Sequence, residues 1–228
     1  MSNEIKRTFI IDALFIMLLL FYLLSHYENP FVFLRGINTG MTEIEQVMWV
    51  MLFAPVWGTG FYIIEKNFEL IPLTLYRYRS RVKWWNIVEL IIMVHTIAVY
   101  AVTGIVLYII KPEYFQLNVI ILIAVHGLFL MQIGALSRLI LKKSIMTACI
   151  IILFECAASE LALKYVSKIR YLIPCWGMYG FSNKILKNTG FSVRAVIIAQ
   201  LCVVVFFYLI MFAYSKHFYR GNYNENND

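Results

Sequence analysis

The chain has 228 residues, of which 61% are hydrophobic and only 14% are charged, and its formal net charge is +7. Soluble domains are about half apolar and about a quarter charged, so a soluble fold of this length could not cover so much apolar surface with polar groups. The composition excludes an ordinary cytosolic enzyme, a secreted disulfide scaffold and a disordered chain, and it predicts an all-α polytopic membrane protein.

Six stretches are long and apolar enough to cross a bilayer as helices, because a hydrocarbon core of about 30 Å needs about 20 residues. They cover about residues 8–24, 47–64, 87–110, 119–141, 145–165 and 193–214. We expect one transmembrane domain over residues 1–220 and a disordered cytoplasmic tail at 221–228. The first stretch is expected to stay in the mature protein, because Asp12 interrupts its start and no small-x-small cleavage site follows.

The distribution of Lys and Arg predicts the orientation, since cytoplasmic loops carry an excess of these residues. With the N-terminus and the C-terminus inside, the inner segments hold twelve of the twenty cations. Six of the eight outer cations lie between residues 164 and 194, and they leave open a rival topology in which this segment faces inside. In a membrane protein the +7 charge is read as this orientation signal, so no nucleic acid is expected as a partner.

The second stretch contains Pro55, Gly58 and Gly60, which are expected to kink or loosen its helix. The loop that follows has the sequence EKNFELIPLTLYRYRSRVKWWN over residues 65–86. Its apolar side chains at i, i+3 and i+7 predict one helical face, formed by Phe68, Ile71 and Leu75.

A basic run follows this apolar face and consists of Arg77, Arg79, Arg81 and Lys83. Trp84 and Trp85 then stand where the chain is expected to re-enter the membrane interface. Two interpretations stay open and are compatible with each other. The loop is an orientation signal with an aromatic anchor, or it is a short cytoplasmic helix that docks on a soluble partner.

Ionisable side chains within the six stretches are candidate functional groups. They are Asp12, Glu89, His95, His126, Glu155 and Glu160. A carboxylate at the position of Glu155 costs about 2.5–3.5 kcal/mol on insertion scales, so we expect a partner or a water-filled cavity, and His95 or His126 could supply the partner. Hydrogen bonding between helices is favoured over proton relay or metal ligation. Asp12, Glu89 and Glu160 lie nearer to the ends and are expected to reach headgroup water.

The segment over residues 161–194 alternates basic and apolar groups. Its cations include Lys164, Lys168 and Arg170, and its centre has the sequence YLIPCWGMYGF, which contains Trp176. This centre is too short to span a bilayer, and its proline and glycines would break a long helix. It predicts an interfacial or re-entrant hairpin on the outer face, with an ordinary amphipathic loop as the alternative.

Motifs of soluble and membrane enzymes are absent from the sequence. The chain has no GxxxxGK[ST] phosphate loop, no HExxH and no GxSxG, so catalysis and ATP binding are not expected in this chain. Cys149, Cys156 and Cys202 lie in apolar runs and Cys175 lies in a loop, so neither a disulfide framework nor a metal site is expected. An intramembrane enzyme that uses Glu155 is a distant alternative.

Six spans, an inner N-terminus, a basic loop after the second span and a hairpin after the fifth together resemble the ABC-2 type transporter permease. The segment YRYRSRVKWW, residues 76–85, is similar to the inner loop of small permeases encoded beside bacteriocin and lantibiotic clusters in Gram-positive bacteria. The resemblance covers the whole chain as architecture and about ten residues as sequence. It implies a multi-pass protein of a bacterial cell membrane.

The resemblance also implies partners and site residues. The chain would pair with a second copy or a sister permease, and separate ABC ATP-binding subunits, which hold the ATP and magnesium, would dock on the inner loop. The coupling helix would cover residues 68–83, with partner-binding side chains Phe68, Ile71, Leu75, Arg77, Arg79, Arg81 and Lys83. The outer gate or substrate path would include Glu155, Glu160, Lys164, Lys168, Arg170 and Trp176.

The function expected from this resemblance is ATP-driven movement of a peptide or another amphipathic substrate across the cell membrane. One departure from larger transporters is the short loop at 26–46, which leaves no room for a large extracellular sensor domain. The alternative is a non-transporting membrane immunity protein or receptor-like protein, which would also be small, basic and without catalytic motifs.

Overall fold

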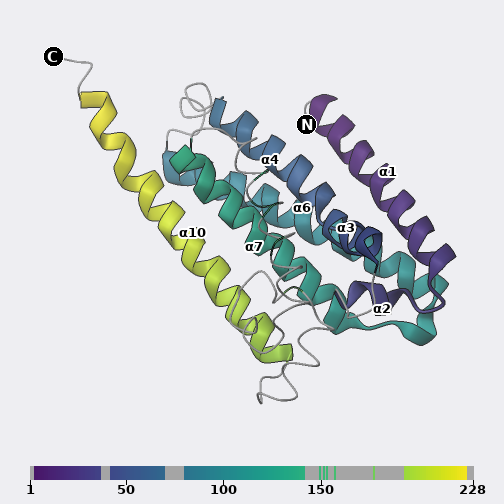
Figure 1. The fold of residues 1–228 in the computed structure, drawn as a ribbon. Helices are drawn as coiled ribbons and strands as arrows, with labels where there is room; N and C mark the ends of the chain where they lie inside the picture. The colour runs from purple at the N-terminus through teal and green to yellow at the C-terminus, as the bar shows by residue number, and fades with distance from the viewer. Residues whose placement is uncertain are drawn as a thin grey trace.

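The computed structural model describes residues 3–36, 42–69, 80–141, 149, 151, 153, 157, 177 and 193–224. Within these residues the regular elements are helices, as Figure 1 shows. They are α1 (Asn3–His26), α2 (Pro30–Leu34), α3 (Glu43–Met51), α4 (Ala54–Glu69), α6 (Arg81–Ile110), the 3₁₀ helix η1 (Pro112–Tyr114), α7 (Leu117–Leu141) and α10 (Val193–Asn224). The prediction of an all-helical chain is confirmed for the described residues.

Four helical stretches in the described part of the chain are long and apolar enough to cross a membrane. They are Glu43–Lys66, Val82–Ile110, Leu117–Arg138 and Val193–Tyr214. The apolar part of α1, Ile10–His26, is shorter. The predicted fifth span, 145–165, lies outside the described residues except for single positions. α10 continues to Asn224, so it includes four residues of the segment expected to be a disordered tail.

The second apolar stretch is interrupted near its proline. α3 ends at Met51 and α4 begins at Ala54, with Leu52 and Phe53 between them. Pro55 has no N–H to donate to the carbonyl four residues earlier, and its ring clashes with that carbonyl. The predicted irregularity of this helix at Pro55 is therefore confirmed, and its position next to Phe53 matters for the site described below.

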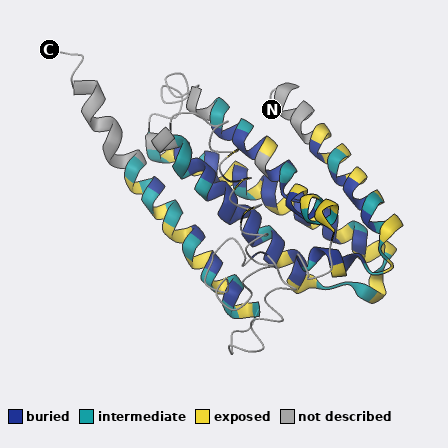
Figure 2. Ribbon diagram, viewed as in Figure 1, coloured by how far each residue is buried: buried dark blue, intermediate teal, exposed yellow. Residues whose placement is uncertain are grey.

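α7 is the central helix of the bundle, and it packs against α4, α6 and α10. Figure 2 shows buried residues along most of α7, whereas α1 and α10 carry exposed residues along their outer sides. A helix that is apolar all round must be buried or lie in lipid, and α7 is covered by its neighbours. The core therefore lies along α7.

The residue pairs between α7 and its neighbours show which helices run parallel and which run antiparallel to it. Glu89 and Gly104 of α6 contact Gln132 and Ile120 of α7, so α6 and α7 are antiparallel. On the side of α7 that packs against α10, the residue numbers of the contacting pairs rise in the same direction along both helices. The pairs are His126 with Gln200 and Phe129 with Phe207. α7 and α10 are therefore parallel, and α7 ends and α10 begins at opposite ends of the bundle (Figure 1).

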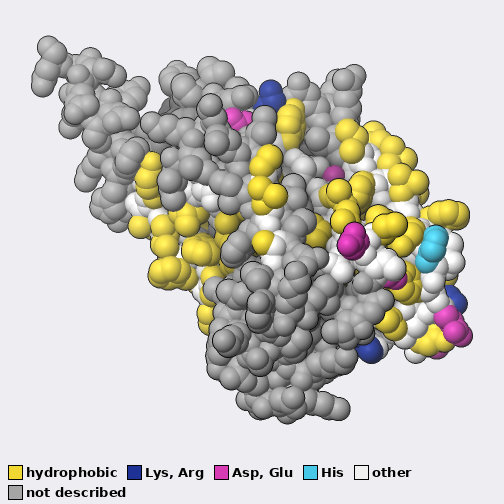
Figure 3. Space-filling model, in the orientation of Figure 1, with side chains coloured by type: hydrophobic (Ala, Val, Ile, Leu, Met, Phe, Trp, Pro, Cys, Tyr) yellow, Lys and Arg dark blue, Asp and Glu magenta, His cyan; other side chains and the backbone are white. Residues whose placement is uncertain are grey.

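The outward sides of α1, α6 and α10 are strongly apolar. Figure 3 shows hydrophobic side chains on the visible face, and large ones such as Phe21, Leu18 and Ile109 are 74%, 70% and 70% exposed. Soluble monomers rarely expose contiguous apolar surface of this extent. This surface fits contact with lipid tails, and it leaves the interior as the place where polar groups gather.

Candidate functional site

Polar and ionisable side chains from five helices are buried inside this apolar bundle, and we call them the polar interior. They are Asp12, Thr59, Glu89, His95, Thr96, Thr103, His126, Gln132 and Gln200. A hydrocarbon environment offers no hydrogen bonds, so such groups need partners within the protein or in an enclosed water-filled space. The way in which they pair shows which helices they join.

The first group joins α1, α4 and α6. The Thr59 hydroxyl donates to Asp12 Oδ2 over 2.5 Å, and His95 Nε2 lies 3.5 Å from the same oxygen. Asp12 is 5% exposed and His95 is 1% exposed. The expectation that Asp12 reaches headgroup water is therefore wrong, because its side of α1 faces α4 and α6 rather than the end of the span.

The second group joins α6 and α7 through one hydrogen bond, in which Gln132 Nε2 donates to Glu89 Oε2 over 2.6 Å. Glu89 is 1% exposed, so the expectation that it reaches headgroup water is also wrong. Glu89 Oε1 and Gln132 Oε1 are buried and have no hydrogen-bond partner among the described residues. The amide of Gln132 thus satisfies one oxygen of the Glu89 carboxyl group and leaves the other oxygen without a donor among the described residues.

The third group joins the middle of α7 to the N-terminal part of α10. Gln200 Nε2 lies 3.1 Å from His126 Nδ1, and because an amide N–H₂ can only donate, the imidazole nitrogen accepts. Gly177 is buried against the same imidazole, and a Cβ built there would lie 2.5 Å from His126 Cδ2. Gly177 belongs to the centre of the predicted outer hairpin, so this position of the hairpin lies inside the bundle next to α7.

The interruption of the second span meets the polar interior. The Phe53 ring contacts the His126 ring at a centroid distance of 5.2 Å and the Tyr100 ring at 6.1 Å. The Tyr100 hydroxyl and the Thr96 hydroxyl are buried and lack a hydrogen-bond partner among the described residues. These hydroxyls, the histidine and Gln200 could bind water or a polar group of a substrate.

The C-terminal ends of α4 and α7 are joined by an ion pair. Arg138 Nε and Nη2 donate to the two oxygens of Glu65 over 2.6 and 3.0 Å, which is the bidentate geometry that fixes both side chains. At the other end, the Tyr27 hydroxyl donates to Glu45, and burial together with this bond raises the pKa of the Tyr27 phenol. Polar contacts thus join α4 to α7 at one end of the bundle and the residue after α1 to α3 at the other.

Most of the site residues predicted from sequence lie outside the described residues. This holds for Ile71, Leu75, Arg77, Arg79, Glu155, Glu160, Lys164, Lys168, Arg170 and Trp176. Of the remaining three, Phe68 lies in the last turn of α4, and Arg81 and Lys83 lie in the first turn of α6. The two ends of the predicted coupling helix at 68–83 therefore belong to two longer helices.

Sequence reasoning missed the neutral partners in the polar interior. Gln132, Gln200 and Thr59 lie in apolar helices and were not singled out, because attention to ionisable residues passes over uncharged amides and hydroxyls. A usable signal was present, since a glutamine in the middle of a long apolar run is as conspicuous as a histidine. The residue spacing within one helix does not show which residue of another helix is the hydrogen-bond partner of such a glutamine.

The described residues contain no group of three or more His, Cys, Asp or Glu side chains that could hold a metal ion. The chemistry available to the polar interior is hydrogen bonding and proton exchange by carboxylates, imidazoles, amides and hydroxyls. Comparisons of the chain with protein-family models, with curated proteins and with solved structures find no match.

Proposed function

We propose that the chain is the membrane-spanning permease subunit of a transporter driven by ATP hydrolysis in a separate partner subunit. The observation that carries the proposal is the polar interior beside the interruption at Phe53, within a bundle whose outside is apolar. Polar groups are costly at membrane depth and mark pathways or sites, and interrupted helices are common at the sites of transporters.

The proposed topology has six spans and both termini in the cytoplasm. Its fifth span, at 145–165, is supported by the parallel packing of α7 and α10, because a helix there would join the opposite ends at which α7 ends and α10 begins. The orientation is supported by the cations Lys66, Lys83 and Arg138, which lie in the terminal turns of membrane-length helices at the same end of the bundle.

The outer segment at 161–194 is proposed to form a re-entrant hairpin. Gly177 supports this, because it packs on His126 near the middle of the Leu117–Arg138 stretch rather than at its outer end. A hairpin that reaches this depth would bring its own cations and apolar groups toward the polar interior, where an amphipathic peptide could bind.

The energy source and the cargo follow from the resemblance to ABC-2 type permeases. Two copies, or one copy and a sister permease, would form the substrate path, and ATP-binding subunits would dock at 68–83. ATP binding in the partner would favour one of two conformations of the pair, and hydrolysis would return it to the other. The substrate class is a peptide or another amphipathic molecule.

Affinity purification tests the proposal. The tagged chain, co-expressed with its neighbouring genes and extracted in mild detergent, should recover a protein with a GxxxxGK[ST] phosphate loop. Reversal of charge at Arg77, Arg79 and Arg81 should abolish the recovery, because these cations belong to the proposed docking segment. The matched control reverses Lys184 and Lys187 in the outer segment and should retain the partner.

Two outcomes would contradict the transporter. Recovery of the chain alone under these conditions would argue against an ATPase partner. Protection of cells against a bacteriocin that survives deletion of the ATPase gene would favour the alternative of a non-transporting immunity protein. Either outcome would contradict the proposed transport function and would leave the description of the apolar helical bundle unchanged.

A further inference from the structure

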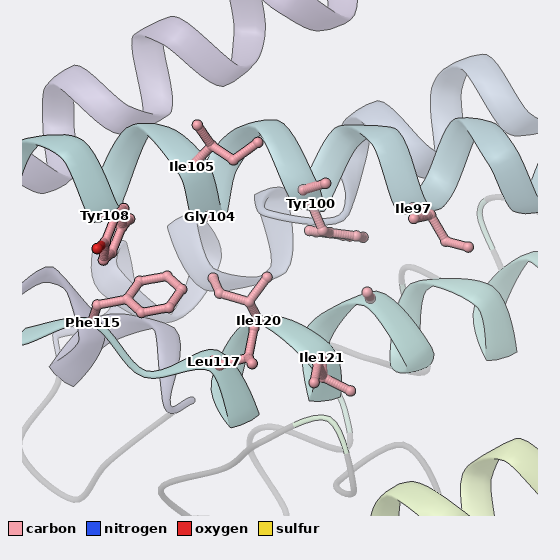
Figure 4. Close-up of a pocket in the computed structure, with 11 residues that line it drawn as sticks. Ile97, Tyr100, Gly104, Ile105, Tyr108, Phe115, Leu117, Ile120 and Ile121 are labelled. Atoms are coloured by element: carbon pink, nitrogen blue, oxygen red, sulfur yellow. The ribbon is translucent and has the colours of Figure 1, made fainter. Parts of the chain in front are cut away.

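A groove of about 450 Å³ runs along the seam between α6 and α7, outside the polar interior (Figure 4). Its lining residues are Ile97, Tyr100, Ala101, Gly104, Ile105, Tyr108, Phe115, Leu117, Ile120, Ile121 and Ala124. Those on α6 recur every three or four residues, as do those on α7, so each helix contributes one face. Apart from the phenol groups of two tyrosines, the lining side chains are apolar.

Small side chains make the seam hollow. Ala101 and Gly104 on α6 face the groove together with Ala124 on α7. Gly104 packs closely on α7, since a Cβ there would lie 3.2 Å from Ile120 Cγ2. Larger neighbours such as Ile97 and Ile121 are exposed at the rim, so the groove opens on the apolar outer side of the bundle.

The length of the groove matches one leaflet of a bilayer. From Ile97 to Tyr108 it follows α6 for about 16 Å at a rise of about 1.5 Å per residue. Half of a hydrocarbon core is about 15 Å. Ile97 lies near the middle of the Val82–Ile110 stretch and Tyr108 near its end, so the groove covers the half on the side of η1.

The volume of the groove also indicates which kind of ligand fits inside it. A helix about 10 Å across would need roughly 1,200 Å³ over the same length, so a helix of a second copy would enter a groove of this volume only with its side chains. A single hydrocarbon chain is much thinner and finds apolar walls along its whole length. Tyr108 and Phe115 line the end near η1, with ring centroids 5.1 Å apart.

A positively charged side chain lies beyond the end of the groove near η1. Lys111 follows Tyr108 by three residues, at the point where α6 ends and η1 begins. The other nearby charges are Glu113 in η1 and Arg35, whose Nε donates to Gln116. Lys111 and Arg35 outweigh the single charge of Glu113, so the net positive charge at this height favours an anionic lipid over a zwitterionic one.

We propose that this groove binds one acyl chain of an anionic glycerophospholipid of the leaflet on the side of η1, with its phosphate near Lys111. The inference rests on the membrane placement in the proposed function, and it does not depend on transport or on an ATPase. Such a lipid would fill the seam between α6 and the central helix α7, and it would occupy the outer leaflet in the proposed orientation.

Photochemical labelling tests this site on the full chain in vesicles of phosphatidylcholine and phosphatidylglycerol. The probe is phosphatidylglycerol with a diazirine in one acyl chain, and adducts are located by mass spectrometry. We expect adducts on the groove faces of α6 and α7. Ala101→Phe should reduce them about tenfold, which corresponds to lost burial of about two methylene groups. Ala98→Phe is the control, because Ala98 is exposed on α6 outside the groove.

Two further variants keep the test decisive. Ala124→Phe fills the groove from α7 and should reproduce the effect of Ala101→Phe. Lys111→Gln should lower the preference for phosphatidylglycerol over phosphatidylcholine, whereas Lys83→Gln at the other end of α6 should not. Adducts on exposed residues such as Phe21 and Leu209 but none in the groove would overturn the lipid site alone. The absence of adducts from the entire chain would overturn the membrane placement as well.

Discussion

At the scale of single residues, the Asp12 carboxylate shows how an ionisable group is held inside an apolar bundle. Its partners, Thr59 and His95, come from two other helices, and one of its oxygens serves both of them. Breaking such a contact leaves a buried carboxylate with fewer donors, and the cost of an unsatisfied buried group exceeds the net value of an ordinary hydrogen bond. The contact therefore stabilises the packing of α1 against its neighbours.

Thr59→Val is expected to destabilise the protein by about 1–3 kcal/mol, because the isosteric side chain removes the hydroxyl donor of Asp12. The matched control is Thr103→Val, since the Thr103 hydroxyl donates to the carbonyl of Val99 in its own helix and joins no second helix. This control should stay close to the wild type. Thermal unfolding in detergent measures both, and an equal loss in the two variants would contradict a tie between α1 and α4.

The residue scale also shows what the sequence could reveal. The sequence identified six ionisable groups within the spans, and the structure buries the four that it describes, Asp12, Glu89, His95 and His126. It failed on the environment of Asp12 and Glu89, because distance from the end of a span says nothing about which side of the helix faces protein. Rotation about the helix axis is decided by packing with helices far along the chain.

At the scale of elements, α7 owes its central position to small residues that let other helices approach. At Gly134 an added Cβ would lie 2.0 Å from Phe61 Cε1, and at Gly60 it would lie 2.2 Å from Met131 Cε. A methionine end can move, whereas a buried aromatic ring in a packed core moves at greater cost. α4 and α7 therefore pack closely because of Gly134 in particular.

Gly134→Ala should destabilise the bundle by about 1–3 kcal/mol, because the new methyl group overlaps the Phe61 ring. Gly58→Ala is the matched control, since a Cβ at Gly58 in α4 has no atom within 4 Å. Alanine there should stabilise the helix by about 0.5–1 kcal/mol. Chemical or thermal unfolding in the same detergent compares them, and a neutral Gly134→Ala would show that the helices are less closely packed than described.

The sequence predicted the positions of the helices better than the surroundings of single residues. Apolar runs near 20 residues long located the helices around 87–110, 119–141 and 193–214, because lipid imposes length and composition directly. Pro55 correctly indicated the interruption of the second span. The depth of Gly177 beside His126 could not be obtained in the same way, because it depends on how a short segment packs within the finished bundle.

At the scale of the whole molecule, the directions of the helices restrict the topology. α6 and α7 form an antiparallel pair joined by η1, whereas α7 and α10 run in the same direction. In the proposed orientation, Lys83 at the start of α6 faces the cytoplasm and Glu113 in η1 faces outward. Both side chains are exposed, so they can report the side of the membrane on which each end lies.

Single-cysteine variants test this arrangement after replacement of the four native cysteines by serine. Glu113→Cys should react with a membrane-impermeant maleimide on intact cells, and Lys83→Cys should react only after permeabilisation. Labelling is measured by gel shift or mass spectrometry. The reverse pattern would invert the orientation, and reaction of both on intact cells would contradict a crossing by α6.

The hydrogen bond between His126 and Gln200 has a consequence for biosynthesis. Its two residues are 74 positions apart, and at about 5–20 residues per second the ribosome delivers the second roughly 4–15 seconds after the first. During that interval the side of α7 that later receives α10 is available to lipid or to the insertion machinery. Assembly of this protein is therefore finished from its C-terminal end, and a chain that stops before residue 193 would present that side of α7 to cellular quality control.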